Sequence, residues 1–461
     1  MATSVPVTFF FVALVILLGF ITSRIFQTTR FPDVPLLLSI GLILGPLNRA
    51  GIGGLHSEFL ASALNETTFR AIAPFVSQLA LVVILFDSGL KLDLQHVAKG
   101  FRPAFLHTVP TMTLTVLGIS LVGIYVWGMP VVLAVVLGVA LSNVGQTVSA
   151  LLVREINIPP ATRSVYFIEM AIYDVISIPI LVGLLELAKA GGSPNFVVFA
   201  ESIARVASVS IMFGLVGGLI WIWVLLRLEN YPYTYMVTLA SLLLVYSLNS
   251  FAGGSGAISA LVFGLVLGNR NSILKLANKR VRIVEEGERV HSFHDEITFF
   301  IRSFFFVFLG IIFSTGRSAE GDLLEWNIAS RYWPLSAANG TAVLFLVGCL
   351  LMLVVIIGFR YLVVRYVSAR TDPDHMSLWA IYSRGLGTAV LATFPFTLPE
   401  YIDQSGAYFA LLRPYEEIFF NAALLIILLT VVGTAVTVYI EENRLTRVAR
   451  QQSGRTTSVK E

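Results

Sequence analysis

Asp174 is an acidic residue near the middle of the apolar stretch 167–187, which is about long enough to cross a bilayer. A carboxylate at membrane depth is costly to keep, and such residues usually mark a path for ions or protons. Glu169 lies earlier in the same stretch. Two acids in one spanning helix therefore indicate ion or proton transport.

Depth along the predicted helices separates the roles of these two acids. At 1.5 Å per helical residue, Asp174 lies roughly 18 Å from the cytoplasmic end of its segment, close to the midplane, and Glu169 lies roughly 10 Å from it. Arg384, in another apolar segment, lies at the same depth as Glu169, roughly 10 Å. We expect Glu169 and Arg384 to form a structural ion pair, because a buried charge left alone costs about 3–5 kcal/mol.

Asp174 then has no basic partner of its own. Apolar surroundings disfavour the charged form of a carboxyl group, so Asp174 can be neutral with a proton or charged with a bound metal cation. A site that holds either a proton or a monovalent cation, but never both, gives exchange by competition. The alternative is a buried acid that is satisfied by hydrogen bonds alone.

The polar run 142–147 could supply neutral ligands for the cation, since hard cations prefer oxygen ligands. An unwound Gly145 would also free backbone carbonyl groups. The alternative is ordinary packing of helices through small polar residues. The candidate side-chain ligands in this run are Ser142, Asn143, Gln146 and Thr147, and Tyr173, next to Asp174, is a further candidate at the cation and proton site.

Asp87 lies near the cytoplasmic end of another apolar segment. It is a candidate acid in a vestibule leading to the site. The alternative is a pair with Lys91, one helical turn away, at the membrane interface.

The composition is that of a polytopic membrane protein. The chain has 461 residues, of which 56% are hydrophobic and 13% charged, and its mean hydropathy is +0.82. Soluble domains carry about 25% charged residues. The single cysteine, Cys349, allows neither a disulfide within the chain nor a cysteine-based metal site. We expect no cofactor beyond the transported ions, no nucleic-acid partner and no enzymatic activity, because no nucleophile, base and acid share one depth.

About thirteen apolar segments are long enough, or nearly so, to cross a membrane. Most of the 31 lysines and arginines fall in loops that are cytoplasmic if the N-terminus is outside. We therefore expect an outside N-terminus, a cytoplasmic C-terminus and a charged cytoplasmic loop at 270–296. The segments run roughly over 5–26, 34–48, 71–90, 104–127, 130–153, 162–187, 205–226, 233–252, 256–269, 297–315, 337–364, 377–398 and 417–440.

The segments also form a repeat of two six-helix halves, segments 1–6 and 8–13. The short segments 2 and 9 carry the matching stretches Gly41–Gly45 and Gly264–Gly268. Segments 5 and 12 carry the polar, glycine-containing stretches 142–147 and 383–388. The odd segment between the halves inverts the second half relative to the first. Interrupted helices at matching places in two inverted halves are typical of a transporter site.

Five motifs, in order along residues 31–440, resemble those of sodium/proton antiporters of the cation:proton antiporter superfamily. Phe86-Asp-Ser-Gly-Leu90 is similar to the family's "FEGGL", and Met170-Ala-Ile-Tyr-Asp174, preceded by Glu169, to its "ES..ND" helix. The segment from Ser255 resembles "SG.LAAFVAG". The other two are Phe304-Phe-Phe-Val-Phe-Leu-Gly310, similar to "FFVFLG", and Ser383-Arg-Gly385, similar to "LRG".

The resemblance implies a membrane exchanger domain over 1–441, followed by a short basic cytoplasmic tail over 442–461. It implies a dimerisation part at about 5–90 and 233–315 and a mobile core at about 104–187 and 337–440. It further implies crossed, broken helices 5 and 12, a homodimer in the lipid bilayer of the cell membrane, and an elevator-like motion of the core. In the family the final Asp of the motif, here Asp174, binds the cation, and the Glu–Arg pair ties two core helices.

The chain departs from the family's pattern in two places. Tyr173 stands where the family usually has Asn or Asp beside the cation-binding Asp. The family's "TDP" on helix 5 appears as Gly145-Gln-Thr147, or shifted onto Ser142-Asn143. With one titrating carboxylate, we expect one proton to exchange for one monovalent cation, so that no net charge moves.

Four functions fit the sequence. The first is a monovalent cation/proton antiporter, with sodium favoured and potassium possible. The others are a channel-like potassium efflux protein, a symporter of organic anions that uses Arg384 if Glu169 does not neutralise it, and a transport-deficient sensor with the same fold.

Overall fold

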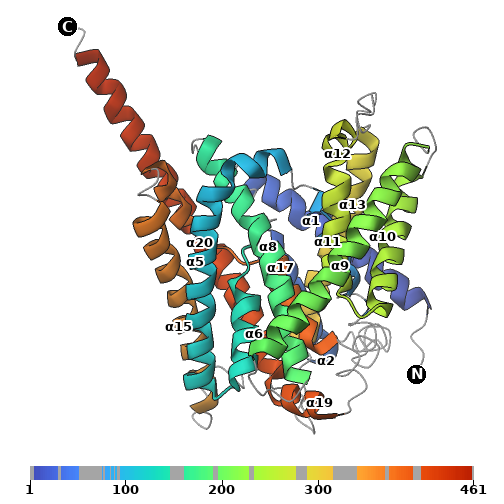
Figure 1. The fold of residues 1–461 in the computed structure, drawn as a ribbon. Helices are drawn as coiled ribbons and strands as arrows, with labels where there is room; N and C mark the ends of the chain where they lie inside the picture. The colour runs from blue at the N-terminus through green and yellow to red at the C-terminus, as the bar shows by residue number, and fades with distance from the viewer. Residues whose placement is uncertain are drawn as a thin grey trace.

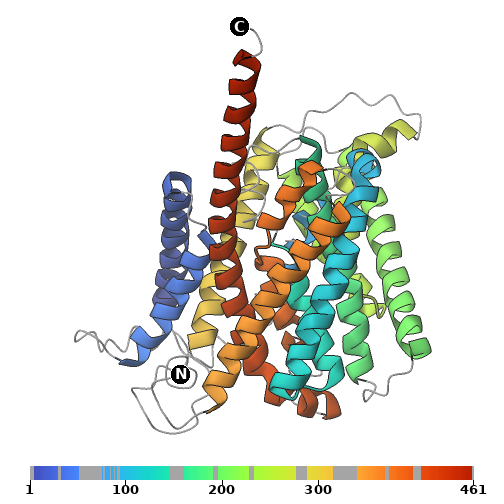
Figure 2. The same cartoon turned by 90° about the vertical axis from the view of Figure 1, so that its left-hand side faces the viewer.

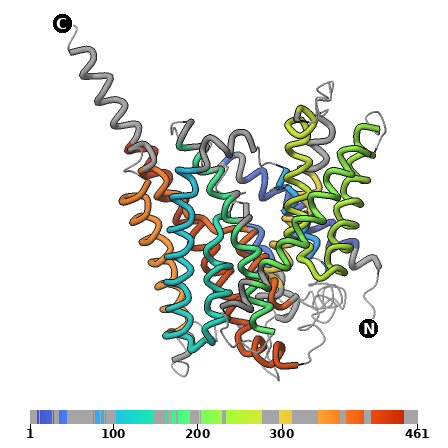
Figure 3. Tube along the Cα trace, in the orientation of Figure 1, coloured from blue at the N-terminus to red at the C-terminus, as the bar shows by residue number. Residues whose placement is uncertain are grey.

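The computed structural model describes an all-helical chain, with no strand in the described residues (Figure 1). Figure 3 traces the same chain in the orientation of Figure 1. The described residues are 5–29, 33–50, 75, 78–83, 85–87, 89–90, 94–145, 160–189, 196–227, 233–276, 288–314, 340–368, 373–397 and 406–458.

Five stretches of helix in the described residues are long and apolar enough to cross a membrane. Helices suit a bilayer because they satisfy their own backbone hydrogen bonds. Many large apolar side chains on these helices are exposed on the outside of the bundle, among them Leu117, Leu121 and Tyr125. The five stretches are Arg102–Trp127, Ala204–Leu225, Thr234–Phe251, Val343–Ser368 and Gly406–Arg444.

One group of helices packs around α13, α9 and α11. Here α13 contacts α1 and α2, and α11 contacts α9 and α10. These helices lie on the right of the molecule in Figure 1. Their bounds are α1 Val5–Thr29, α2 Asp33–Ala50, α9 Phe196–Leu225, α10 Thr234–Phe251, α11 Gly256–Gly268, the short α12 Arg270–Leu276, and α13 Glu288–Ser314.

A second group packs around α5 and carries the candidate site. Here α5 contacts α6, α8 and α15, and α17 contacts α6 and α20. The helices are α5 Leu94–Trp127, α6 Val131–Ser142, α8 Pro160–Lys189, α15 Gly340–Val363, α17 Leu386–Thr393 and α20 Glu416–Ser458. Shorter helical pieces join them: η1 Val364–Ser368 (a π-helix), three 3₁₀ turns (η2 Pro373–Ala380, η3 Phe394–Thr397 and η4 Arg413–Tyr415), and α19 Gly406–Leu412.

Glycines bring two pairs of segments into backbone contact. Gly41 of α2 and Gly310 of α13 face each other, so that a Cβ on either would meet the backbone of the other helix. Gly264 and Gly268 of α11 face the backbone of Phe86 and Leu90 in the same way. Segment 2 thus packs on segment 10, and segment 9 packs on segment 3.

The last helix runs on into the residues of the predicted basic tail. The helix α20 continues without a break from Glu416 to Ser458. Figures 1 and 2 both show its last part extending beyond the other helices. The predicted tail 442–461 is therefore, as far as Ser458, a continuation of the last spanning helix.

Candidate functional site

The two polar, interrupted stretches meet inside the second helix group. Helix α6 ends at Ser142, and Asn143 has an extended backbone. The backbone N–H of Gly145 donates a hydrogen bond of 2.8 Å to the carbonyl oxygen of Ser383. The Thr388 hydroxyl donates one of 2.8 Å to the carbonyl oxygen of Asn143. The stretches are far apart in sequence, and each supplies part of the other's backbone hydrogen bonding.

The second stretch is not helical from Ile381 to Gly385, between η2 and α17. Inside a membrane its freed N–H groups need other partners. Threonines of α20 provide them: the N–H of Tyr382 donates to Thr434 Oγ1 at 3.2 Å, and the N–H of Arg384 donates to Thr430 Oγ1 at 3.0 Å. The α20 helix therefore provides acceptors for two of the N–H groups that the interruption frees.

The interruption also contacts α8 close to Asp174. The Asn143 side-chain amide donates to Ser177 Oγ at 3.2 Å, and Ser177 in turn donates to the carbonyl oxygen of Tyr173. Asp174 lies on this turn of α8, although its side chain is outside the described part of the structure. The helix turn that carries Asp174 therefore adjoins the meeting point of the two interrupted stretches.

The structure describes some of the other candidate residues and not the rest. The Ser142 hydroxyl is buried and donates to the carbonyl oxygen of Val139 in its own helix, at 2.9 Å. Asn143 is buried at the interruption itself. Gln146 and Thr147 lie outside the described residues. Asp87 is buried, with 8% of its surface exposed, and its proposed partner Lys91 also lies outside the described residues.

Glu169 has a different partner from the predicted one. Its carboxylate accepts two hydrogen bonds from the guanidinium of Arg360 on α15, at 2.7 and 3.1 Å, and not from Arg384. Arg360 also donates from Nε to the carbonyl oxygen of Leu378, at 2.9 Å. Both Glu169 and Arg360 are almost wholly buried. The bidentate geometry is the strong form of this ion pair, and it corrects the predicted pair of Glu169 and Arg384.

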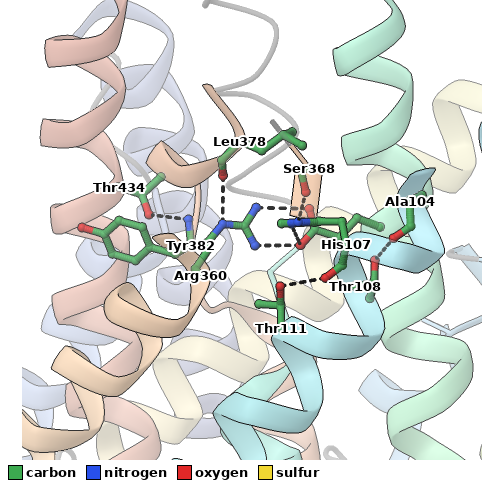
Figure 4. A network of polar contacts seen from close by, with 10 residues as sticks. Ala104, His107, Thr108, Thr111, Arg360, Ser368, Leu378, Tyr382 and Thr434 are labelled. Atoms are coloured by element: carbon green, nitrogen blue, oxygen red, sulfur yellow. Dashed lines mark hydrogen bonds and ion pairs between the residues drawn. The ribbon is translucent and has the colours of Figure 1, made fainter. Parts of the chain in front are cut away.

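His107 of α5 completes the Glu169 cluster (Figure 4). Its Nε2 lies 3.4 Å from Glu169 Oε1, and its Nδ1 shares a hydrogen bond of 2.8 Å with the hydroxyl of Ser368 in η1. The cluster of Glu169, Arg360, His107 and Ser368 joins α5, α8, α15 and η1. We call it the buried charge cluster.

Position in the sequence makes Arg360 and His107 candidates for the layer of Glu169, but it does not show which residue pairs with Glu169. Both lie within about one helical turn of the predicted cytoplasmic ends of their segments, 337–364 and 104–127. Glu169 is within two turns of the cytoplasmic end of its own segment, so all three share a shallow layer.

The sequence profile of the family described as "Sodium/hydrogen exchanger, transmembrane" matches residues 11–442. The chain belongs to this family. The match covers both interrupted stretches, α8 and the buried charge cluster.

Three known proteins illustrate the similarity. The chain is 23% identical over 252 residues to the low-affinity Na⁺/H⁺ antiporter NhaS1 of Synechocystis, covering 54% of this chain and 47% of that protein. It is 21% identical over 440 residues to the K⁺/H⁺ antiporter NhaP of Alkalimonas amylolytica, covering 93% of this chain and 65% of that protein. The matches thus span about half to two thirds of these relatives' lengths. The solved structure of the sodium proton antiporter MjNhaP1 from Methanocaldococcus jannaschii has the same fold, with a TM-score of 0.69, 19% identity, and coverage of 95% of this chain and 96% of that one.

This sodium/hydrogen exchanger family member keeps two buried polar groups without hydrogen-bond partners near Asp174. In the part of the chain that the structure describes, Nε and Nη1 of Arg384 have no partner, and neither does the hydroxyl of Tyr173. Arg384 is 2% exposed and Tyr173 is fully buried. Since Arg360 neutralises Glu169, the charge of Arg384 is not balanced by the acid predicted to pair with it.

Proposed function

We propose that the chain exchanges a monovalent cation for protons across the cell membrane, with Asp174 holding either ion in turn. The observation that carries this proposal is the meeting of the two interrupted stretches, through Gly145 and Ser383, against the turn of α8 that bears Asp174. Interrupted helices at membrane depth are tolerated where they line a site. Membership of the sodium/hydrogen exchanger family supports the same reading.

The architecture proposed for this exchange is an inverted repeat of six-segment halves, about thirteen segments in all. The glycine contacts support it. Exchanging the halves converts segment 2 into 9 and segment 10 into 3, and the structure packs 2 on 10 and 9 on 3 in the same way. We assign the first helix group, apart from α9, to the dimerisation part (about 5–90 and 233–315), and the second group to the core (about 104–187 and 337–440). In our proposal the chain is a homodimer, and the core moves as an elevator.

The proposed orientation has the N-terminus outside and the C-terminus in the cytoplasm. The described end of α20 and the short α12, beside the predicted cytoplasmic loop 270–296, lie on the same side of the bundle in Figures 1 and 2. Loops rich in Lys and Arg stay on the cytoplasmic side. The common side of these two basic regions supports this orientation.

Exchange of one cation for one proton moves no net charge. Moving one elementary charge across the membrane would add about 2.3 kcal/mol per 100 mV of potential. An exchanger with Asp174 as its one titrating site avoids this term and depends on the two ion gradients alone. Sodium is the favoured cation because two of the compared proteins are named as sodium antiporters.

Potassium is the second candidate cation. The relative with the longest match of the three described, over 93% of this chain, is named as a K⁺/H⁺ antiporter. Neutral oxygen ligands at the interruption do not by themselves choose between the two ions. A transport assay with each ion therefore identifies the transported cation.

Reconstituted vesicles test the proposal. A sodium or potassium gradient is imposed and the internal pH is followed, with and without a clamped membrane potential. We expect proton movement that depends on the cation and not on the potential. Asp174→Asn should reduce it to the level of empty vesicles, with unchanged yield and oligomeric state, while Glu201→Gln, at an exposed acid on α9, should leave it intact. Normal exchange by Asp174→Asn would show that the site lies elsewhere.

A further inference from the structure

One face of α20 carries a row of polar side chains along the interrupted stretch 381–385. The four residues follow one another at intervals of four, three and four positions, which places them on the same face of a helix. Small polar residues on a membrane helix commonly join it to its neighbours by hydrogen bonds. We call these residues the polar stripe of α20: Thr430, Thr434, Thr437 and Glu441.

The first two members of the polar stripe pair with the backbone of the interrupted stretch. Thr430 Oγ1 accepts from the N–H of Arg384 at 3.0 Å, and Thr434 Oγ1 accepts from the N–H of Tyr382 at 3.2 Å (Figure 4). Four residues of helix rise about 6 Å, and two residues of extended chain span about 6.6 Å. Because these lengths match, the two threonines can each reach an N–H group of the non-helical backbone.

The other two members extend the pairing toward η2. Thr437 Oγ1 donates to the carbonyl oxygen of Ala380 at 2.6 Å, and Glu441 Oε2 accepts from Trp379 Nε1 at 3.4 Å. The contacts run in opposite order along the two segments, so the segments are antiparallel. The polar stripe therefore holds this segment at four places, two of which are the N–H groups of the interruption.

The interrupted stretch in turn holds a candidate cation ligand, Asn143. The carbonyl oxygen of Ser383 accepts from the N–H of Gly145 at 2.8 Å, and the Thr388 hydroxyl donates to the carbonyl oxygen of Asn143 at 2.8 Å. A series of short contacts therefore leads from α20, through the interrupted stretch, to the backbone that carries Asn143. No step in this series depends on the protonation or charge of the acid on α8.

We propose that Thr430 and Thr434 are positioning residues that set the affinity and the selectivity of the cation site. In this role neither threonine contacts the cation, and each acts by fixing the backbone that packs on Asn143. Binding groups must be held within about 0.5 Å of their working positions. Sodium is smaller than potassium, so a displaced ligand changes the affinity for the two ions unequally. The inference rests on the proposed function for its transport readout only.

The first test measures the position of the interrupted stretch without transport. Amide hydrogen exchange of the purified protein is followed in peptides that cover 381–385, since exchange reports local opening. Thr430→Val keeps the shape of the side chain and removes the acceptor for the Arg384 N–H. Exchange in these peptides should therefore become about threefold to tenfold faster, the equivalent of one hydrogen bond, while peptides of α20 stay protected. Thr430→Ser keeps the acceptor and should behave as the wild type.

The control is Thr22→Val in α1, in the other helix group. Thr22 is buried and its hydroxyl donates to the carbonyl oxygen of Gly19 in its own helix, at 2.8 Å. This variant loses a threonine hydrogen bond of similar length and should leave exchange at 381–385 unchanged. Thr434→Val, which removes the acceptor for the Tyr382 N–H, is the second test variant and covers the case in which Thr430→Val does not fold.

The second test measures the cation dependence of exchange in vesicles. Initial rates are recorded over a range of sodium and of potassium concentrations. In Thr430→Val and Thr434→Val we expect the apparent KM for sodium to rise about threefold to tenfold and its ratio to the KM for potassium to change, with the maximal rate within about twofold of the wild type. Thr430→Ser should restore the wild-type values, and Thr22→Val should keep them.

A purely structural role would change melting alone. Lower melting temperatures with unchanged KM values and an unchanged sodium-to-potassium ratio overturn the proposal, as does unchanged hydrogen exchange at 381–385 in both valine variants. An equal shift of KM in Thr22→Val overturns it as well. If wild-type vesicles show no exchange while both valine variants lose protection at 381–385, the proposed function fails, and the part of the inference that places the stretch through the two threonines stands.

Discussion

Two polar regions of the same helix group differ in how fully their side chains are paired. In the buried charge cluster, Glu169, Arg360, His107 and Ser368 contact one another, and Arg360 also binds the Leu378 carbonyl. At the interruption, Thr430, Thr434 and Thr388 pair three backbone groups, but in the described part of the chain the buried side chains of Arg384 and Tyr173 have atoms without partners.

The difference separates a structural role from a binding role. The buried charge cluster fixes the relative positions of four helical elements through the bidentate pair of Glu169 and Arg360, although His107 Nε2 has no hydrogen-bond partner among the described residues. At the interruption, buried side chains without partners still have donors to offer. The two arginines make the contrast plain, since both are buried and only Arg360 has an acidic partner among the described residues.

The largest effect should come from exchanging the two arginines for glutamine in separate variants. Arg360→Gln leaves Glu169 as a buried charge without its main partner, and should lower the free energy of unfolding by about 3–5 kcal/mol. Arg384→Gln removes a charge that has no acidic partner among the described residues, and should cost less than Arg360→Gln. Thermal melting of the two single variants measures both losses. A double variant, Arg360→Gln with Glu169→Gln, removes the whole ion pair.

The double variant is the control for this prediction. It should lose less stability than the sum of the losses in Arg360→Gln and Glu169→Gln, because both charges of the pair are removed together. Equal losses for Arg360→Gln and Arg384→Gln would mean that the ion pair with Glu169 does not make Arg360 more important for stability than Arg384.

The second prediction tests the close backbone contact at the interruption. A Cβ on Gly145 would meet the backbone of Arg384 and Gly385. Gly145→Ala should therefore push the two stretches apart, cost about 1–3 kcal/mol, and reduce exchange. The control is Gly358→Ala on α15, where a Cβ meets nothing within 4 Å and removal of a helical glycine should stabilise by about 0.5–1 kcal/mol. Exchange and melting that respond alike in the two variants would argue against a tight crossing.

Sequence reasoning identified the elements of the site better than their pairing. Five short motifs predicted the family. Hydropathy predicted the all-helical membrane fold, because a helix is one of the few structures that satisfy all backbone hydrogen bonds in lipid. The non-helical backbone at 381–385 overlaps the predicted polar stretch 383–388 at residues 383–385, since glycines and small polar residues mark places where a helix can open. The same motifs and hydropathy did not predict which arginine pairs with Glu169.

Depth alone could not choose between Arg384 and Arg360. Both arginines lie close to the layer of Glu169, and the choice depends on which helix face each occupies. Arg384 stands in non-helical backbone, where helical periodicity no longer gives the direction of a side chain. Arg360 and His107 reach Glu169 from α15 and α5, which pack together, and this packing is not visible in one sequence.

The third prediction concerns the weakest member of the buried charge cluster. His107→Gln keeps a polar side chain but loses the contact with Glu169 at 3.4 Å and the hydrogen bond to Ser368. We expect a loss of about 1–2 kcal/mol in melting experiments, with exchange retained under conditions where the protein stays folded. Ser368→Ala should cost about 1 kcal/mol, and the double variant should cost less than the two together. Loss of exchange in a well-folded His107→Gln protein would instead give this cluster a part in transport.

The smallest effect should come from the side-chain hydrogen bond that joins the two interrupted stretches. Thr388→Val removes the bond from the hydroxyl to the Asn143 carbonyl while keeping the shape of the side chain. It should cost about 1 kcal/mol, because the carbonyl is then left buried between two segments. Thr393→Val, on the same helix α17, removes a bond to the carbonyl of Val390 within one turn, and that carbonyl belongs to the same helix rather than to a neighbouring segment. A larger loss for Thr393→Val than for Thr388→Val would show that the contact between the stretches adds nothing beyond ordinary helix geometry.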